Sequence, residues 1–185
     1  MPTPTNTVPN PDNYYSGKGI MYFKREGETE FRDLGNCPMF DMTPAVQRLE
    51  HYSARNGIRV KDQSLVSSRQ LTCRITMDEV TADNLALALM TTPVAAGSPS
   101  TDHYDYSMDI MVDDEVRGAV RFVGKNAVGA PIQVDLPVVT FAPGQAITLI
   151  QEQYGNLEIT GEVSADPTTG SFGKVYWNIT QEINL

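Results

Sequence analysis

The strongest structural signal in this sequence is a strict alternation of apolar and polar residues in segment 68–78. Alternate positions carry four apolar side chains, Leu71, Cys73, Ile75 and Met77. The intervening positions carry Ser68, Gln70, Thr72, Arg74, Thr76 and Asp78. A period of two residues is typical of a β-strand with one buried side and one side in water. The segment therefore predicts a half-buried strand around which the remaining chain organises.

One helix is predicted immediately after this strand. Thr81 can act as an N-cap, and Asp83 suits the first helical turn. The run of Leu and Ala that follows in segment 85–90 has high helix propensity. Because no comparable signal occurs elsewhere, we expect a single α-helix at about residues 81–91.

The remaining chain contains short apolar or alternating runs separated by Gly, Pro, Asn and Asp. The runs expected to form strands are 19–23, 31–36, 39–49, 104–112, 116–123, 132–141, 145–151, 156–163 and 174–180. Pro44 and Pro137 interrupt two of them, and each indicates an edge strand or a bulge. In the last strand, Val175, Trp177 and Ile179 are expected to face inward. Many short strands of this kind are typical of a mainly-β sandwich or barrel.

Length and composition bound the domain organisation. The 185 residues suit one domain, and 41% hydrophobic residues can supply its core. Residues 1–16 are rich in Pro, Thr and Asn and predict an extended N-terminal arm, which leaves residues 17–185 as a single β domain. The N-terminus has no signal-peptide pattern, so we expect folding in a cytoplasm. Cys37 and Cys73 do not make a disulfide framework and are expected to be free, buried thiols.

The segment between the two central strands has an unusual charge. Residues 50–66 show no clean period and predict a long inter-strand loop, a kind of connection that is usually functional or mobile. Residues 48–74 contain six basic and two acidic residues, whereas the whole chain carries a net charge of −9. A basic arm on an acidic body favours contact with a second copy, and such a heterologous contact can propagate as a ring or filament. The alternative is a solvated loop with incidental charge.

No constellation of catalytic or metal-binding residues is evident, so we predict that the chain is not an enzyme and needs no cofactor. His51 and His103 are the only histidines, and strand alternation would split the cluster at 102–105 between two faces. The acidic series from Asp102 to Glu115 lacks the glycine and spacing of a calcium loop. That series is either a solvated turn or a docking surface for a neighbour's basic arm. The acidic pI near 4.6 argues against a grip on nucleic acid through its phosphates.

Several motifs occur here in a specific order. They are Leu-Glu-His-Tyr-Ser at 49–53, Gly-Ile-Arg-Val-Lys-Asp at 57–62, the alternating strand, and Asn-Leu-Ala-Leu at 84–87. In this order and spacing the chain resembles the major tail tube proteins of long, non-contractile-tailed bacteriophages, the siphophages. The resemblance covers about residues 17–92, and the later half matches only in its all-β character.

The resemblance implies a β-sandwich or barrel-like tail tube fold with one helix and a long inter-strand loop. It also implies a structural virion protein, assembled in the host cytoplasm, that forms stacked hexameric rings. Inner strands of such rings build a continuous barrel, and double-stranded DNA passes through the lumen without sequence-specific binding. The implied partners are other copies of the chain and the tape-measure, tail terminator and distal tail proteins, with no membrane.

The resemblance also assigns roles to residues. The inter-ring loop falls on about residues 49–63, where Arg55, Arg59 and Lys61, next to Asp62, are expected to meet acidic groups of the next ring. The polar strand faces are candidates for the lumen lining. They comprise Asp41, Thr43, Gln47, Ser68, Gln70, Thr72, Thr76 and Asp78, with Glu158, Thr160, Glu162, Asn178, Thr180 and Glu182 from the last two strands. Arg74 is the exception on this face and is expected to pair with an acid of a neighbouring strand or subunit.

Two other function classes remain open. One is a soluble ligand- or carbohydrate-binding β-sandwich with an aromatic platform drawn from Tyr104, Tyr106, Tyr154, Tyr176 or Trp177. The apparently apolar strand around Trp177 favours a core position over a platform. The other class is a secretion-system tube protein, which would assemble in a physically similar way.

Overall fold

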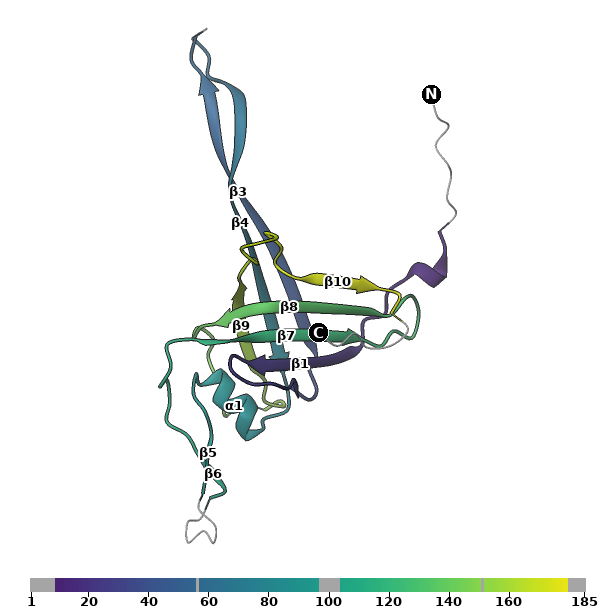
Figure 1. Ribbon diagram of the computed structural model, residues 1–185, viewed down its shortest axis with the longest axis vertical. Helices are drawn as coiled ribbons and strands as arrows, with labels where there is room; N and C mark the ends of the chain where they lie inside the picture. The colour runs from purple at the N-terminus through teal and green to yellow at the C-terminus, as the bar shows by residue number, and fades with distance from the viewer. Residues whose placement is uncertain (1–8, 56, 97–103, 151, 180–185) are drawn as a thin grey trace.

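The computed structural model describes residues 9–55, 57–96, 104–150 and 152–179. It is mainly β with one α-helix, as the sequence predicted, and its strands are antiparallel (Figure 1). The elements, in chain order, are the 3-10 helix η1 (Pro11–Asn13), β1 (Gly19–Arg25), β2 (Arg32–Asp33), β3 (Met39–Ser53), β4 (Val60–Met77), α1 (Ala82–Ala88), β5 (Val94–Ala95), β6 (Tyr106–Ser107), β7 (Val116–Gly124), β8 (Ile132–Phe141), β9 (Leu157–Val163) and β10 (Lys174–Trp177).

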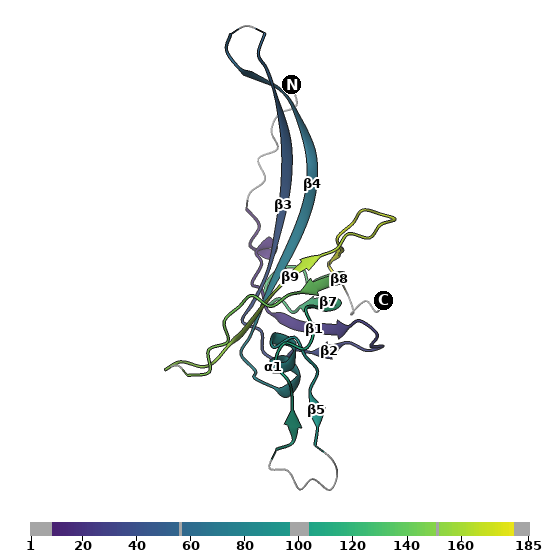
Figure 2. The same ribbon diagram turned by 90° about the vertical axis from the view of Figure 1, so that its left-hand side faces the viewer.

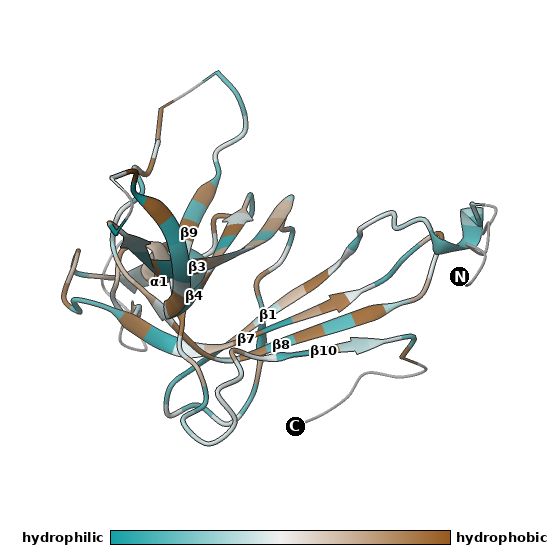
Figure 3. Cartoon of the chain, turned by 90° about the horizontal axis from the view of Figure 1, so that it is seen from above, coloured by the Kyte–Doolittle hydropathy of each residue, from teal (hydrophilic) through white to brown (hydrophobic). Residues whose placement is uncertain are grey.

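Eight strands form a single sheet that is folded at β8. The order is β2-β1-β7-β8-β9-β4-β3, and β10 also pairs with β8. β10 pairs with residues 132–135 of β8, whereas β9 pairs with residues 139–141. Between these two regions lies Pro137, where the register against β7 shifts. A bulge bends a strand and increases its twist, so the predicted irregularity at Pro137 is the corner at which the sheet turns. Consequently β1, β7, β8 and β10 run across β3, β4 and β9 (Figures 1 and 3).

The core lies between the two halves of the folded sheet, and α1 covers one end. Phe141 is fully buried and meets Phe23 edge-on at 5.8 Å between ring centroids. On α1, Leu87 belongs to this core. The buried Asn84 amide donates to the carbonyl oxygens of Leu34 (2.8 Å) and Glu79 (3.0 Å). These bonds tie the helix to the loops before β3 and after β4.

Phe141 offers a test of this core. We expect Phe141→Ala to lower the free energy of unfolding by about 3–5 kcal/mol, because it removes a fully buried ring and leaves a cavity. Urea denaturation at low protein concentration measures the change. The matched control is Ile150→Ala, whose side chain is 94% exposed and which should change stability by no more than about 0.5 kcal/mol. Equal effects of the two substitutions would contradict the assigned core.

The predicted loop at 50–66 is wrong in its bounds. β3 and β4 pair along their whole length, from Met39 opposite Thr76 to Ser53 opposite Val60, so they form one long hairpin with a short turn. Register shifts occur between Gln47 and Arg48 and again after His51. Each shift disturbs the alternation, which explains why this part of the sequence shows no clean period. Pro44, by contrast, causes no shift and lies on an edge strand.

Five smaller predictions also need correction. The helix is shorter than expected, from Ala82 to Ala88, with the Thr81 side chain as its N-cap. The expected strand at 104–112 is reduced to β6, and the expected strand at 145–151 is irregular in its described residues. Val175 and Trp177 do not face inward; both are largely exposed, because β10 lies at the side of the sheet. Part of the predicted extended arm forms η1, capped by Asn10.

Both cysteines are free thiols, as predicted. Cys73 is buried, whereas Cys37 is only half-buried. Burial raises the pKa of each thiol to about 12. Both groups therefore remain neutral near pH 7.

Candidate functional site

The most unusual feature of the molecule is the end of the β3–β4 hairpin that projects from the body. We call residues 43–70 the distal hairpin (Figures 1 and 2). Every side chain of β3 from Asp41 to Tyr52 is exposed, on both faces of the strand. β9 pairs with β4 only from Leu71 onward, so the distal part of β4 has β3 as its sole sheet neighbour in the described chain. The distal hairpin is thus a two-stranded ribbon with solvent on both faces.

This ribbon carries large apolar side chains that nothing in the described chain covers. They are Val46, Leu49, Ile58, Val60, Leu65 and Val66, each between 52% and 76% exposed. An isolated two-stranded hairpin is only marginally stable in water. Strand alternation and register place Val46 and Val66 on one face and Leu49 and Leu65 on the other, so both faces expose apolar side chains. The distal hairpin therefore has the character of a surface that is buried in an assembly.

The hairpin also has an open edge. β3 is the last strand of the sheet and extends over 15 residues. A long exposed edge presents unpaired N–H and C=O groups and is a template for pairing with another strand. Proteins usually block such edges with charges, prolines or bulges. Here Pro44 blocks one position, and Asp41, Arg48 and Glu50 are the only charged residues on the strand.

Most of the predicted lumen residues do share one face of the hairpin. The register places Asp41 opposite Arg74, Thr43 opposite Thr72, and Gln47 opposite Ser68. Strand alternation adds Gln70 to this face, which we call the polar face. β9 continues it with Glu158, Thr160 and Glu162, which pair with Thr76, Arg74 and Thr72.

Arg74 lies in the middle of the polar face and is paired, as expected. Its guanidinium donates to the Asp41 carboxylate at 2.7 Å and lies 3.8 Å from Glu158. The hydrogen bond to Asp41 raises the pKa of Arg74 above its ordinary value. Two acids therefore flank the one base at the centre of this face, and its net charge is acidic.

Other predicted lumen residues do not line the polar face. Thr76 points to that side but is buried. Asp78 lies beyond the end of β4, where it accepts hydrogen bonds from Asn36. Asn178 follows β10, in the other half of the sheet. Thr180 and Glu182 lie outside the described residues.

Sequence reasoning missed that the polar face changes character toward the tip. The register pairs Leu49 with Leu65. Because β3 has no inserted residue, Leu49 follows Gln47 on the same face. The extra residue, Ser67, is on β4, and it shifts Leu65 to that face too. On this face the polar pair Gln47 and Ser68 is thus followed by the apolar pair Leu49 and Leu65, and then by the polar pair His51 and Gln63.

The four residues predicted for an inter-ring contact all lie at or near the tip of the distal hairpin. Lys61 donates a hydrogen bond to Glu50, and Asp62 bonds to His51 at 2.6 Å. The hydrogen bonds from Lys61 and from Tyr52 hold the pKa of Glu50 below its ordinary value. Lys61 is therefore paired with Glu50 inside the hairpin, and Asp62 is held by its hydrogen bond with His51.

Two arginines at the tip have no acidic partner in the described part of the chain. The Arg59 guanidinium lies 5.3 Å from the centroid of the Tyr52 ring. Arg55 occupies the turn and has no hydrogen bond or ion pair among the described residues. The outward-facing positive charge of the tip therefore rests mainly on Arg55 and Arg59.

The acidic segment lies at the other end of the molecule, beside β5 and β6 (Figure 1). Two of its acids are engaged: Asp113 accepts from Arg25 at 2.8 Å, and Glu115 pairs with Arg117 at 2.6 Å. Asp109 and Asp114 are exposed. Between them lie the exposed side chains of Ile110, Met111 and Val112. Residues 102 and 103 of the predicted cluster lie outside the described residues.

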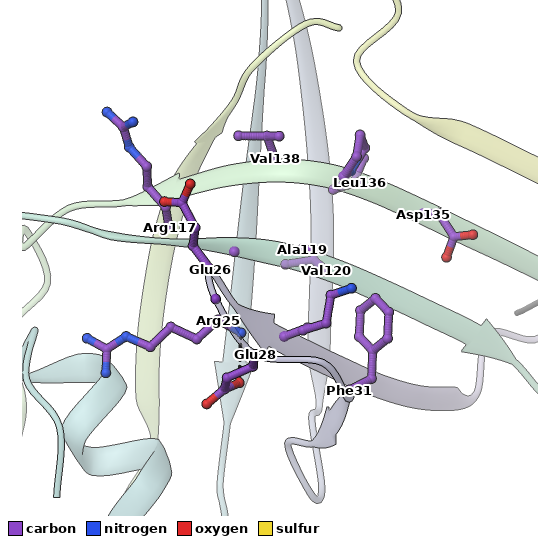
Figure 4. A pocket seen from close by; sticks show the side chains of 14 residues that line it. Arg25, Glu26, Glu28, Phe31, Arg117, Ala119, Val120, Asp135, Leu136 and Val138 are labelled. Carbon is purple, nitrogen blue, oxygen red and sulfur yellow. Dashed lines mark hydrogen bonds between the residues drawn. The ribbon is translucent and has the colours of Figure 1, made fainter. Parts of the chain in front are cut away.

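A hollow of about 430 Å³ opens on the β1–β7–β8 surface (Figure 4). Its charged side chains diverge: Arg25 and Arg117 extend away from Asp135. Asp135 is buried and accepts a hydrogen bond from Arg121 at 2.7 Å. Within the described ranges, no three His, Cys, Asp or Glu side chains converge as metal ligands. The hairpin is therefore the better candidate site.

Comparison with known proteins places the chain in a family. It matches the family described as "Protein of unknown function UCP028589" over residues 14–104 and 103–176. This chain belongs to that family. The match includes both the distal hairpin and the body of the folded sheet. A search of curated proteins found no match. No helix in the described part of the chain is long and apolar enough to cross a membrane.

Proposed function

We propose that this chain is a structural subunit that assembles with copies of itself into stacked rings, forming the tail tube of a long-tailed bacteriophage. The tube would be a virion component and a conduit for DNA. The observation that carries the proposal is the open 15-residue edge of β3 on a hairpin with both faces exposed. The resemblance of residues 17–92 to siphophage tail tube proteins supplies the biological setting.

The direction of the strands allows neighbouring copies to pair in a ring. β3 and β4 are antiparallel within one copy. In copies related by rotation about an axis along the hairpin, β3 of one copy therefore runs antiparallel to the distal β4 of the next. This heterologous contact uses two different edges, so it closes into a ring when the rotation fits. Closure removes the exposed edges, as in any β-barrel.

The polar face suits the wall of a channel for DNA. Asp41, Glu158 and Glu162 outnumber Arg74, and the other side chains are small and uncharged or amides. A lining of this charge repels a polyanion weakly, whereas a basic lining would hold it through counterion release. On the opposite face, Met42 and Val46 are apolar and exposed, and would pack against neighbouring subunits.

Stacking of rings would use the two ends of the molecule. The tip presents Arg55 and Arg59 beside the apolar Ile58 and Val60. The opposite end presents Asp109 and Asp114 beside Ile110, Met111 and Val112. The tip is basic and the opposite end is acidic, and each has apolar side chains beside its charges. This complementarity favours head-to-tail contact between rings. Tape-measure, tail terminator and distal tail proteins would be the other partners.

A ligand-binding sandwich is the second candidate, because Trp177 is 63% exposed rather than buried. Two of the platform candidates lie far apart in the sheet topology, however. Tyr106 lies on β6 at the acidic end, whereas Trp177 ends β10 beside β8. A secretion-system tube would use the same assembly surfaces in a different particle.

Negative-stain electron microscopy across a concentration series tests the proposal. We expect rings or hollow tubes of uniform diameter, becoming more abundant as the concentration rises. A monodisperse monomer at every concentration, or amorphous aggregates alone, would contradict it.

A further inference from the structure

The connection between β8 and β9 also projects from the body (Figure 2). It comprises residues 142–156 and contains no helix or strand in its described residues. Leu149 is 80% exposed and Ile150 is 94% exposed, so the described part of the chain leaves both side chains largely uncovered. Ile147, by contrast, packs against the core and anchors the base of the loop. Long structureless connections in compact domains are usually either functional or mobile. We call residues 145–154 the apolar loop.

A groove of about 490 Å³ opens where the two halves of the sheet diverge. It is lined mainly by apolar side chains of five strands, among them Met21, Phe40, Met42, Phe122, Ile132 and Val134. Met42 and Val175 lie at its exposed margin. Apolar concave surfaces of this size are typical binding sites. The described part of the chain leaves the groove unfilled.

The groove and the apolar loop lie on the two sides of the subunit that ring closure would bring together. The groove is lined by Met39 to Met42, which form the base of the open β3 edge. The apolar loop runs directly into β9, which flanks β4 on the other side of the hairpin. A neighbour that adds its β4 and β9 side to the β3 edge therefore places its own apolar loop beside this groove.

Charge is complementary as well. Glu152 in the apolar loop is exposed, and Lys18 lines the groove. Asp41 also lines the groove, but Arg74 pairs with it at 2.7 Å. The net charge at the groove margin therefore favours an acidic partner such as Glu152.

We propose that the apolar loop of one copy inserts Leu149 and Ile150 into this groove of the next copy in the same ring. This inference rests on the proposed self-assembly and names a second, side-chain contact that accompanies strand pairing. The groove takes an aliphatic peg from a second copy of this chain rather than a small-molecule ligand. Each subunit both donates a loop and receives one, so the contact propagates around a closed ring.

Disulfide trapping tests this contact. The background variant carries Cys37→Ser, because Cys37 lines the groove; Cys73 is buried and remains. Into it we introduce Ile150→Cys and Val175→Cys together and oxidise the assembled protein with copper-phenanthroline. We expect a ladder of covalent dimers, trimers and higher species that collapses on reduction. A mixture of the two single variants should give dimers alone, because each copy then has only one of the two thiols.

The matched control pairs Ile150→Cys with Val94→Cys. Val94 is exposed to a similar extent as Val175 but lies on β5, at the acidic end. The control should give only the weak cross-linking that random collisions produce. If electron microscopy shows rings and the Ile150–Val175 pair cross-links no better than the control, the loop contact is wrong and self-assembly stands. If the protein remains monomeric at every concentration, both are wrong.

Discussion

Reversing the charge at the hairpin tip should prevent tube growth while leaving the subunit folded. The variant is Arg55→Glu with Arg59→Glu, since these two arginines have no acidic partner in the described chain. Repulsion from Asp109 and Asp114 of the next ring would replace attraction. We expect the concentration needed for tube formation to rise at least about tenfold, which corresponds to about 1.4 kcal/mol per contact. Electron microscopy and sedimentation velocity measure it.

Adding Lys61→Glu should block polymerisation further, but it is a less specific change. Lys61 donates a hydrogen bond to Glu50 inside the hairpin, so its reversal also places two carboxylates together. The matched control is Lys125→Glu with Lys174→Glu, which changes the net charge by the same amount away from the tip. The control should form tubes at the wild-type concentration. Normal-length tubes from the Arg55 and Arg59 variant would rule out the tip as a stacking contact.

A second proline on the β3 edge should abolish ring closure. Proline is accommodated in a strand where the missing N–H would face away from the partner strand. In an antiparallel strand, every second N–H group points to the same side. Pro44 therefore indicates that the N–H group of Val46, two residues later, also points outward from the sheet. Val46→Pro removes an outward-pointing N–H donor. It also places the pyrrolidine side chain where the strand of a neighbouring copy would pair. We expect loss of rings with little change in the thermal midpoint of the monomer.

The neighbouring position provides the control. Ala45 pairs with Gln70, and its N–H points toward β4 by the same alternation. Ala45→Pro should therefore break a hydrogen bond within the hairpin and lower the stability of the hairpin itself, which hydrogen exchange of β3 amides can detect. Val46→Ile keeps both the backbone donor and an apolar side chain and should assemble normally. Assembly of Val46→Pro at the wild-type concentration would show that the β3 edge is not the ring contact.

Strands with one buried face could be predicted from sequence because burial imposes a period of two. β8 has the expected bounds, β9 begins one residue later than expected, and in β4 the alternating part ends at Met77. The helix was found for a similar reason, since Thr81 and the following Leu and Ala residues have local preferences that agree with the fold. The pairing of Arg74 with acids of neighbouring strands could also be predicted, because Arg74 is the one basic residue on a polar face.

The distal hairpin could not be predicted because both of its faces are in solvent. Without a buried face, nothing selects for alternating apolar and polar residues. The register shifts after Gln47 and His51 disrupt any alternation that is left. The same reasoning explains Trp177: β10 pairs with β8 alone among the described strands, so an apolar run there does not imply burial. The apolar loop was mistaken for a strand because its exposed Leu149 and Ile150 resemble core residues.

The most direct test of the central claim is a cryo-electron microscopy reconstruction of the assembled protein. The account predicts a closed β-wall built from the β3–β4 hairpins, with β3 of each copy beside the β4 side of the next. Asp41, Thr43 and Thr72 should face the channel, and Arg55 should contact the next ring. Assemblies with the hairpins on the outer surface, or with the polar face turned away from the channel, would contradict it.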